Sequence, residues 1–165
     1  MRLYLMRHGI AVDREDPECP SEAERYLTPK GMEKTRAAAW GLRALDVKPE
    51  AMFTSPYLRA VQTAEIACEA LGFRPGKLQR TDALLPESDP GDLFRELGRC
   101  KGSEVLCCGH APNLDLVIAH ALGTAHPVTA LKKAGAACLE LSHLAAGRGE
   151  LIWIMTSKAL RGLAD

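Results

Sequence analysis

Residues 1–10 read MRLYLMRHGI, and the apolar run at residues 3–6 predicts a buried strand at the start of the chain. This strand is followed at once by Arg7-His8-Gly9. A cation and an imidazole at the end of a buried strand have no packing reason to be there. Because ligands in open α/β sheets bind beyond the carboxyl ends of the strands, we interpret Arg7 and His8 as functional residues.

Two further strand-like runs end in similar residues. Residues 105–108 read VLCC and lead into His110, and residues 54–59 read TSPYLR, where a strand turns into a helix that carries Arg59. The carboxyl ends of parallel strands share one edge of a sheet. We therefore expect His8, His110 and both arginines to meet at that edge.

The order of strand and helix patterns predicts an α/β fold, a three-layer α/β/α sandwich with a mainly parallel central sheet. Thr28 and Pro29 are suited to cap and open the first long helix, which should stop before Pro49. Gly72 should end the second. The remaining expected elements are strands at 51–53, 77–81 and 105–108, helices at 58–71, 91–97 and 113–122, a pair of edge strands at 136–141 and 151–155 that resembles a hairpin and allows antiparallel pairing, and a frayed terminal helix.

Length and charge limit the classes of function. A chain of 165 residues buries roughly two-thirds of its unfolded surface in one core, so we expect one domain over residues 1–165. Lys plus Arg and Asp plus Glu both number 21, which leaves no basic field to recruit nucleic acid or a membrane surface. No run approaches the roughly 18 apolar residues of a membrane span, and no signal peptide precedes the first strand. We expect a cytoplasmic protein.

The six cysteines do not read as a disulfide framework or a zinc site. They show no CxxC spacing, and Cys107, Cys108 and Cys138 lie inside apolar runs. We interpret the cysteines mainly as small buried hydrophobic residues rather than as disulfide or zinc partners.

Several motifs in order along the chain resemble those of one family. They are RHGIA at residues 7–11, SPYLRAVQTA at 55–64, LLPESDP at 84–90 and GHAPNLDLV at 109–117. The chain resembles the histidine phosphatase superfamily, and within it the small bacterial subgroup of SixA-type phosphohistidine phosphatases. The resemblance implies a phosphoglycerate-mutase-like fold, and it implies that His8 becomes a transient phosphohistidine while His110 donates to the phosphoryl oxygens.

The chemistry of the residue types agrees with that resemblance. The guanidinium forks of Arg7 and Arg59 suit phosphoryl oxygens, and nearby cations favour the neutral, nucleophilic form of His8. The second ring nitrogen of His8 needs an acceptor, and we expect a backbone carbonyl. The expected substrate-binding residues are Arg7, Arg59, His110, Gly9 and Ala111. We expect no metal and no cofactor, because the arginines supply the charge.

The proton donor departs from the family pattern. Many larger members carry a Glu after the third strand, and Pro86 stands at the matching place here. Glu87 follows it and is our candidate donor, with an exposed loop carboxylate as the alternative. Imidazole leaves phosphorus far more easily than an alkoxide does, so the missing acid favours phosphohistidine over phosphomonoesters.

The remaining polar positions carry weaker expectations. Residues 10–27 hold six acids mixed with two arginines, and we expect a solvated rim. Asn113 either caps its helix or contacts substrate. Gln62 and Thr63 suit hydrogen bonds in helix packing. No insertion is long enough to form a lid, so we expect an open site. Few Lys or Arg residues are evident beyond the phosphate pocket, which leaves little to hold a multiply charged metabolite.

These observations lead to one main hypothesis and two alternatives. The main one is a metal-independent phosphatase that acts on a phosphohistidine-bearing protein, such as a phosphotransfer domain or a sensor kinase, through a covalent intermediate on His8. The first alternative is a phosphatase of a small phosphorylated metabolite. The second is a non-catalytic module that binds a phosphoprotein, although such a module has no need of a nucleophile.

Overall fold

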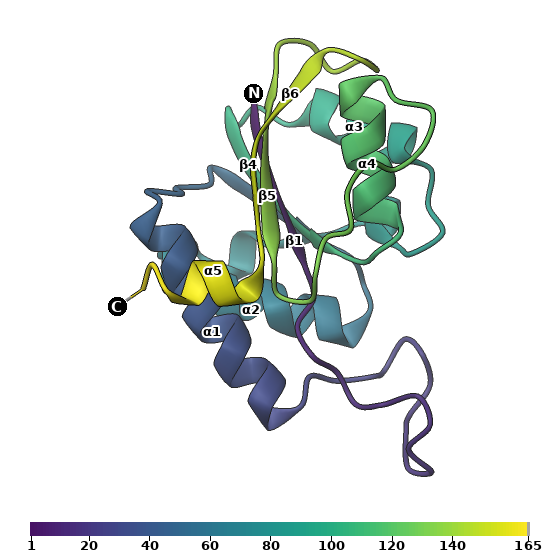
Figure 1. Ribbon diagram of the computed structural model, residues 1–165, viewed down its shortest axis with the longest axis vertical. Coiled ribbons are helices and arrows are strands. Elements are labelled where there is room, and N and C mark those ends of the chain that lie inside the picture. The colour runs from purple at the N-terminus through teal and green to yellow at the C-terminus, as the bar shows by residue number, and fades with distance from the viewer. Residues whose placement is uncertain (165) are drawn as a thin grey trace.

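Strand β1 (Arg2–Arg7) lies inside a sheet that, within residues 1–164, has six strands in the order β3-β2-β4-β1-β5-β6 (Figure 1). Those 164 residues are what the computed structural model describes. Strands β1 to β4 pair in parallel, whereas β5 is antiparallel to β1 and β6 is antiparallel to β5. The mainly parallel sheet and the hairpin-like edge pair are therefore confirmed. The other strands are β2 (Ala51–Thr54), β3 (Gln79–Arg80), β4 (Glu104–Gly109), β5 (Ala136–Leu141) and β6 (Gly149–Met155).

Helices cover both faces of the sheet (Figure 1). This is required because the side chains of β1 point alternately to the two faces and are apolar on both. Leu3 and Leu5 pack with α3 and α4 on one face, and Tyr4 and Met6 pack with α1, α2 and α5 on the other. The expected three-layer sandwich is confirmed. The helices are α1 (Pro29–Ala44), α2 (Leu58–Leu71), α3 (Pro90–Arg99), α4 (Asn113–Leu122) and α5 (Ser157–Arg161), with short 3₁₀ turns η1 (Pro75–Lys77) and η2 (Asp82–Leu84).

Local signals account for most helix ends. The Thr28 hydroxyl accepts a hydrogen bond of 3.0 Å from the Gly31 amide at the start of α1, and Gly72 ends α2 in the left-handed region at φ +69°. Asn113 does not cap α4, because Pro112 precedes the helix and Asn113 is its first residue. Strand β3 is shorter than expected, since η1 takes up the residues before it.

All six cysteines are free thiols, and four of them are buried, which confirms their interpretation as packing residues. Burial raises the pKa of the Cys68 and Cys138 thiols to about 11. Within residues 1–164, the helices are all too short or too polar to cross a membrane.

The strand register brings three chain segments to one edge of the sheet. Arg7 of β1 pairs with Gly109 of β4, and Thr54 of β2 pairs with Cys108 of β4. The ladder continues one step further, because the His8 amide donates to the Gly109 carbonyl at 2.9 Å. The residues just past these three strand ends therefore lie side by side.

Candidate active site

A cavity of about 490 Å³ opens at this edge. Arg7, His8, Arg59 and His110 all line it, and so does Ala111. The four residues that the sequence singled out for chemistry are thus brought together. Their surroundings are strongly charged, because five cationic side chains and two carboxylates line the cavity.

The hydrogen bonds of His8 fix its tautomer. Its Nδ1 lies 2.7 Å from the carbonyl oxygen of Gly9, and a carbonyl only accepts, so Nδ1 carries the proton. This is the backbone acceptor that the sequence led us to expect. The unprotonated Nε2 accepts from Nε of Arg59 at 3.3 Å. His8 is 6% exposed and lines the cavity.

Burial keeps both histidines neutral. The pKa of His8 is lowered to about 2, first by burial and then by His110, with smaller contributions from Arg59 and Arg7. The pKa of His110 is lowered to about 3, again first by burial and then by Arg59. The direction expected for His8 holds, but the main cause is desolvation rather than the neighbouring cations.

His110 is held by residues of the turn into α2. Its Nε2 lies 2.8 Å from the Ser55 hydroxyl, which also accepts from the Tyr57 amide at 3.3 Å. The His110 ring centroid lies 5.1 Å from that of His8 and 5.4 Å from that of Tyr57. Sequence reasoning gave no role to Ser55, although it opens the SPYLRAVQTA motif. Nδ1 of His110 is buried and has no partner among residues 1–164.

Arg7 is oriented by the loop before β5. Its Nη1 donates to the Leu131 carbonyl at 2.8 Å. Asp115 of α4 orders this loop by accepting from the Leu131 amide at 2.9 Å and from the Thr129 hydroxyl at 2.7 Å. Nε of Arg7 is buried without a partner among residues 1–164, so one donor remains for an anion in the cavity.

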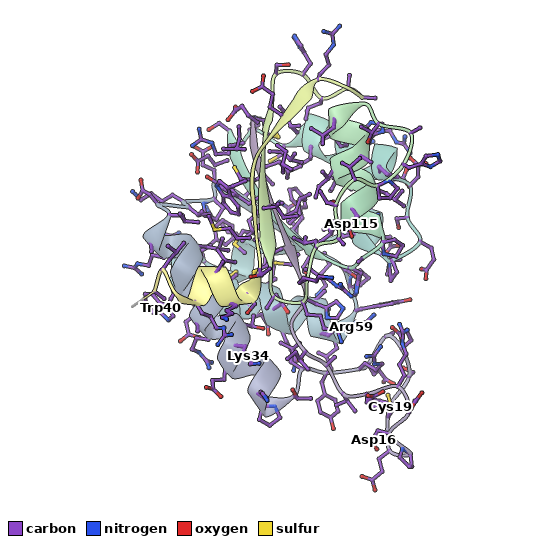
Figure 2. All side chains as sticks on the ribbon, in the orientation of Figure 1. Asp16, Cys19, Lys34, Trp40, Arg59 and Asp115 are labelled. Atoms are coloured by element: carbon purple, nitrogen blue, oxygen red, sulfur yellow. The ribbon has the colours of Figure 1, made fainter. Side chains whose placement is uncertain are left out.

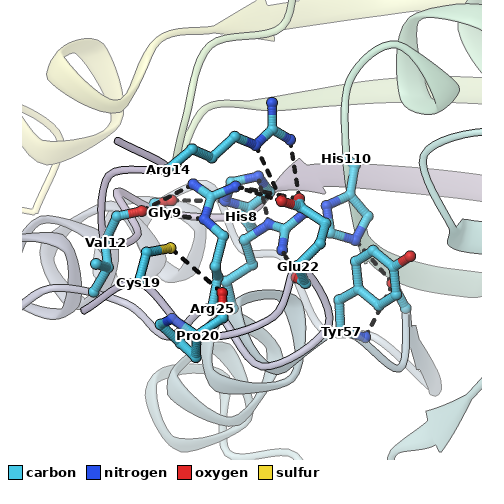
Figure 3. A network of polar contacts seen from close by, with 12 residues as sticks. His8, Gly9, Val12, Arg14, Cys19, Pro20, Glu22, Arg25, Tyr57 and His110 are labelled. Carbon is cyan, nitrogen blue, oxygen red and sulfur yellow. Dashed lines mark hydrogen bonds and ion pairs between the residues drawn. The ribbon is translucent and has the colours of Figure 1, made fainter. Parts of the chain in front are cut away.

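Arg59 is 2% exposed and is tied to a residue that sequence reasoning missed. Its Nη1 donates to the Glu22 carbonyl and its Nη2 to the Glu22 carboxylate, both at 2.6 Å. The same carboxylate binds Arg14 at 2.9 Å and Arg25 at 3.1 Å (Figure 3). Hydrogen bonds from Arg14 are the main cause that lowers the pKa of Glu22 to about 2.

The segment 10–27 is therefore more than the solvated rim that we expected. Arg14 and Arg25 line the cavity, and Glu22 is the counter-charge of the buried Arg59. The physical reason is that a buried guanidinium needs an anionic partner, and the segment supplies one. The mixture of acids with two arginines was the available signal, but no periodic pattern says which acid turns inward.

Gly9, which we expected among the substrate-binding residues, does not line the cavity. Its amide donates to the Thr63 hydroxyl at 3.1 Å, and a Cβ there would lie 2.2 Å from the hydroxyl of Thr35 on α1. Glycine is required by this close approach. Thr63 and Gln62 do form packing hydrogen bonds, the latter accepting from the Leu27 amide at 2.7 Å.

The carboxylates near the cavity are not placed like a buried general acid. Pro86 lines the cavity, whereas the exposed Glu87 next to it does not. Asp13 and Glu15 do line it, and both are exposed. Asn113 donates to the Ser88 carbonyl at 2.9 Å, which ties α4 to the loop that carries Pro86. Within residues 1–164, no cluster of three or more His, Cys, Asp or Glu side chains could hold a metal ion.

Comparisons with known proteins agree on one family. The family model of the histidine phosphatase superfamily (branch 1) matches residues 3–96. An uncharacterised protein of Picosynechococcus is 40% identical over 82% of each chain, and phosphohistidine phosphatase SixA of Escherichia coli is 30% identical over 72% of this chain and 73% of its own. A solved structure of the protein histidine phosphatase SixA with tungstate superposes with a TM-score of 0.84 at 27% identity, over 97% of this chain and 99% of that one.

Proposed function

Because this chain belongs to the histidine phosphatase superfamily and is a phosphatase, we propose that it dephosphorylates histidine on a signalling protein through a covalent phospho-His8 intermediate. The observation that carries the proposal is the state of His8. Its Nδ1 is bound to a carbonyl, its pKa is far below neutrality, and its unprotonated Nε2 accepts from Arg59 at the wall of a cationic cavity, a hydrogen bond that attack on phosphorus would replace. A neutral imidazole in such surroundings is a nucleophile for a phosphoryl group.

The reaction takes two displacements at phosphorus. In the first, the substrate carries a proton on its other ring nitrogen; Nε2 of His8 forms a P–N bond while the P–N bond of the substrate breaks, and the departing imidazole keeps that proton and leaves neutral. In the second, water attacks phospho-His8, the new P–N bond breaks, and inorganic phosphate leaves. Water supplies the oxygen and the protons, so the balance needs no metal, oxidant or other co-reactant.

The cationic donors stabilise the phosphoryl group as it moves. Nε of Arg7 is a buried donor without a partner among residues 1–164, and Arg59 lies against the attacking nitrogen at 3.3 Å. His110 is neutral, and because the Ser55 hydroxyl already accepts from the Tyr57 amide, we assign the Ser55 proton to Nε2 of His110; Nδ1 then carries the ring proton and can donate one further hydrogen bond. Preorganised donors of this kind replace the metal ion that many phosphoryl-transfer sites use.

The leaving group favours phosphohistidine. A phosphomonoester needs an acid to protonate its alkoxide, and the position next to the cavity is taken by Pro86. Two relatives named for phosphohistidine or histidine phosphatase activity support the same substrate class, and a phosphotransfer domain or a sensor kinase is the kind of partner we propose. Glu87, our candidate donor, lies outside the cavity wall, so we propose that it reaches ester leaving groups only and plays no part with phosphohistidine. Glu87→Gln should therefore slow phosphomonoester hydrolysis and spare phosphohistidine.

One observation favours a small phosphorylated metabolite as the second candidate. Arg14, Arg25 and Lys133 line the cavity beyond the phosphate-binding residues, so our expectation of few further cations around the site was wrong. Arg14 and Arg25 lie in the segment after β1, whereas Lys133 lies just before β5. Because these positions are far apart in the sequence, nothing in the sequence indicated that they line one cavity. These side chains offer binding energy to a metabolite with a second anionic group.

A side-by-side rate comparison tests the proposal. We expect kcat/KM for a phosphohistidine-bearing protein domain to exceed that for small phosphomonoesters by at least about a hundredfold, or roughly 2.7 kcal/mol. Activity should survive EDTA. If kcat/KM for a phosphomonoester equalled that for the phosphoprotein, the metabolite phosphatase would become the better proposal. Activity lost to EDTA and restored by a metal would overturn metal independence. Binding of the phosphoprotein without turnover would favour the binding module.

A further inference from the structure

A second cavity, of about 420 Å³, adjoins the catalytic one. The two share Arg7, Ile10 and Lys133 in their walls. Lys34 of α1 (Figure 2) and Lys132 line only the second cavity. No carboxylate of residues 1–164 lines it. The phosphoryl site therefore continues into a compartment whose charged groups are all cationic but whose wall is mostly apolar, which suits lysines that lay their methylene stems along the wall and hold their ammonium groups at its rim.

The lysines of this compartment differ from the arginines of the catalytic cavity in their pairing. Glu22 forms ion pairs with Arg14, Arg25 and Arg59. Within residues 1–164, by contrast, no ion pair within 4.0 Å involves Lys34, Lys132 or Lys133. The positive charge of the second compartment is thus not offset from within.

The crowding of cations is evident at Lys133. Partial burial of the Lys133 ammonium lowers its pKa, and the nearby Arg7 and Arg25 lower it further. Asp13 raises the pKa of Lys133. An anion bound beside Lys133 would relieve this repulsion. The other two lysines are partly or fully exposed, so a partner can reach them from solvent.

The backbone holds the lysines at a fixed place relative to the nucleophile. The amide of Ala134 donates to the carbonyls of Arg7 and His8 at 3.0 and 3.1 Å, and the Gly135 amide closes the turn onto the Lys132 carbonyl at 2.8 Å. Lys132 and Lys133 are therefore anchored by the backbone of the catalytic strand end itself. The turn therefore lies beside the position of a phosphoryl group bound at His8.

We propose that Lys34, Lys132 and Lys133 form a docking subsite for acidic side chains that flank the phosphohistidine of a protein substrate. The inference rests on the proposed function and adds a specificity to it. Lysine is a flexible point charge that suits scattered carboxylates, whereas the forks of Arg7 and Arg59 suit the phosphoryl group. Unpaired charges at the edge of a site also steer an oppositely charged partner during encounter.

Two synthetic phosphohistidine peptides test this subsite. One carries Glu and Asp beside the phosphohistidine, and the other carries Gln and Asn at the same positions. The wild-type protein should prefer the acidic peptide by about fivefold in kcat/KM, the size expected of two partly exposed ion pairs. The preference should shrink as salt is raised.

Charge reversal then assigns the preference to named residues. The double variant Lys34→Glu and Lys132→Glu should abolish or invert the ratio of the two rates. A matched control, Lys77→Glu and Lys101→Glu, makes the same change of charge on exposed lysines that precede β3 and β4, at the opposite ends of the strands, and should keep the ratio. The neutral variant Lys34→Gln and Lys132→Gln should give a ratio near one and guards against a folding defect.

The outcomes separate the two proposals. Equal rates for the two peptides in the wild-type protein, or the same loss of preference in the control variant, would overturn the docking subsite while leaving the proposed function intact. If a phosphoserine peptide matched both phosphohistidine peptides, the proposed function itself would fail. If charge reversal changed the rates only for small compounds with two phosphates, the docking subsite for acidic side chains would be overturned. The second cavity would then bind a second phosphate group.

Discussion

The strand-end half of the site and the segment 10–27 line the same cavity by different means. His8 and His110 are 6% and 1% exposed, and backbone ladders and buried hydrogen bonds hold them. Glu22 and Arg14 are 40% and 70% exposed in their side chains and are held by ion pairs. The sheet thus fixes the histidines that we propose to react, whereas the segment sets the charge around them and is less constrained by the fold.

The largest expected effect concerns Arg59, which joins the two halves. Its Nε contacts His8, and its Nη atoms contact Glu22. Arg59→Lys keeps the charge but loses the fork, so kcat/KM should fall on the order of 10²- to 10³-fold, as when one preorganised donor is removed. Steady-state kinetics measure this, with the exposed Arg36→Lys as control. If Arg59→Lys left kcat/KM almost unchanged, the role of Arg59 would be structural, and Arg59 would not link the histidines to the segment 10–27.

A smaller effect is expected from Glu22→Gln, which alters only the segment. The carboxylate occupies donors of Arg59 that an oxyanion would otherwise use, so its neutralisation should lower the inhibition constant of vanadate roughly tenfold. The value of kcat should fall, because Arg59 is less firmly held.

A matched control for this variant is Glu24→Gln in the same segment, whose carboxylate accepts from Ser21 at 2.6 Å. It should change neither quantity. Weaker vanadate inhibition in Glu22→Gln would mean that Glu22 only positions Arg59 and does not compete for it.

The smallest effect is on acid stability. The folded-state pKa of Glu22 is about 2 against an ordinary value of 4.5, so its ionised form stabilises the fold fully above about pH 4.5, and that stability is lost as the pH falls toward 2. The side chain is 40% exposed, and solvent screening limits the effect to about 1 kcal/mol, or roughly 2–4 °C in Tm.

Thermal melts of the wild-type protein and Glu22→Gln should therefore differ at pH 6 and converge near pH 2.5. A difference that stayed constant over this range would show that the charge of Glu22 does not stabilise the fold.

The same contrast explains what could be predicted from sequence. Apolar runs that lead into Arg7, His8 and His110 mark strand ends, and the carboxyl ends of parallel strands are neighbours, so the meeting of these residues at one edge could be predicted. Thr28 and Gly72 marked helix ends by their own chemistry.

The other features of the site depend on tertiary contacts that leave no local pattern in the sequence. Glu22 turns inward because Arg59 is buried, and the acids around it are equally plausible partners in the sequence. Asp115 acts through a loop contact with Leu131 that only the fold creates. Pro112 stands at the position before α4 that a capping residue would occupy, because its ring fixes a φ that suits the start of a helix. Asn113 is therefore the first residue of the helix.

In the mechanism that we propose, the phosphoryl group passes through Nε2 of His8. The most direct test is to mix the protein with a ³²P-phosphohistidine peptide, quench it within milliseconds in base, and map the label. We predict transient label on His8 that forms and decays at least as fast as turnover, absent in His8→Asn and present in the control His126→Asn. Label on another residue, or undiminished turnover by His8→Asn, would contradict the account.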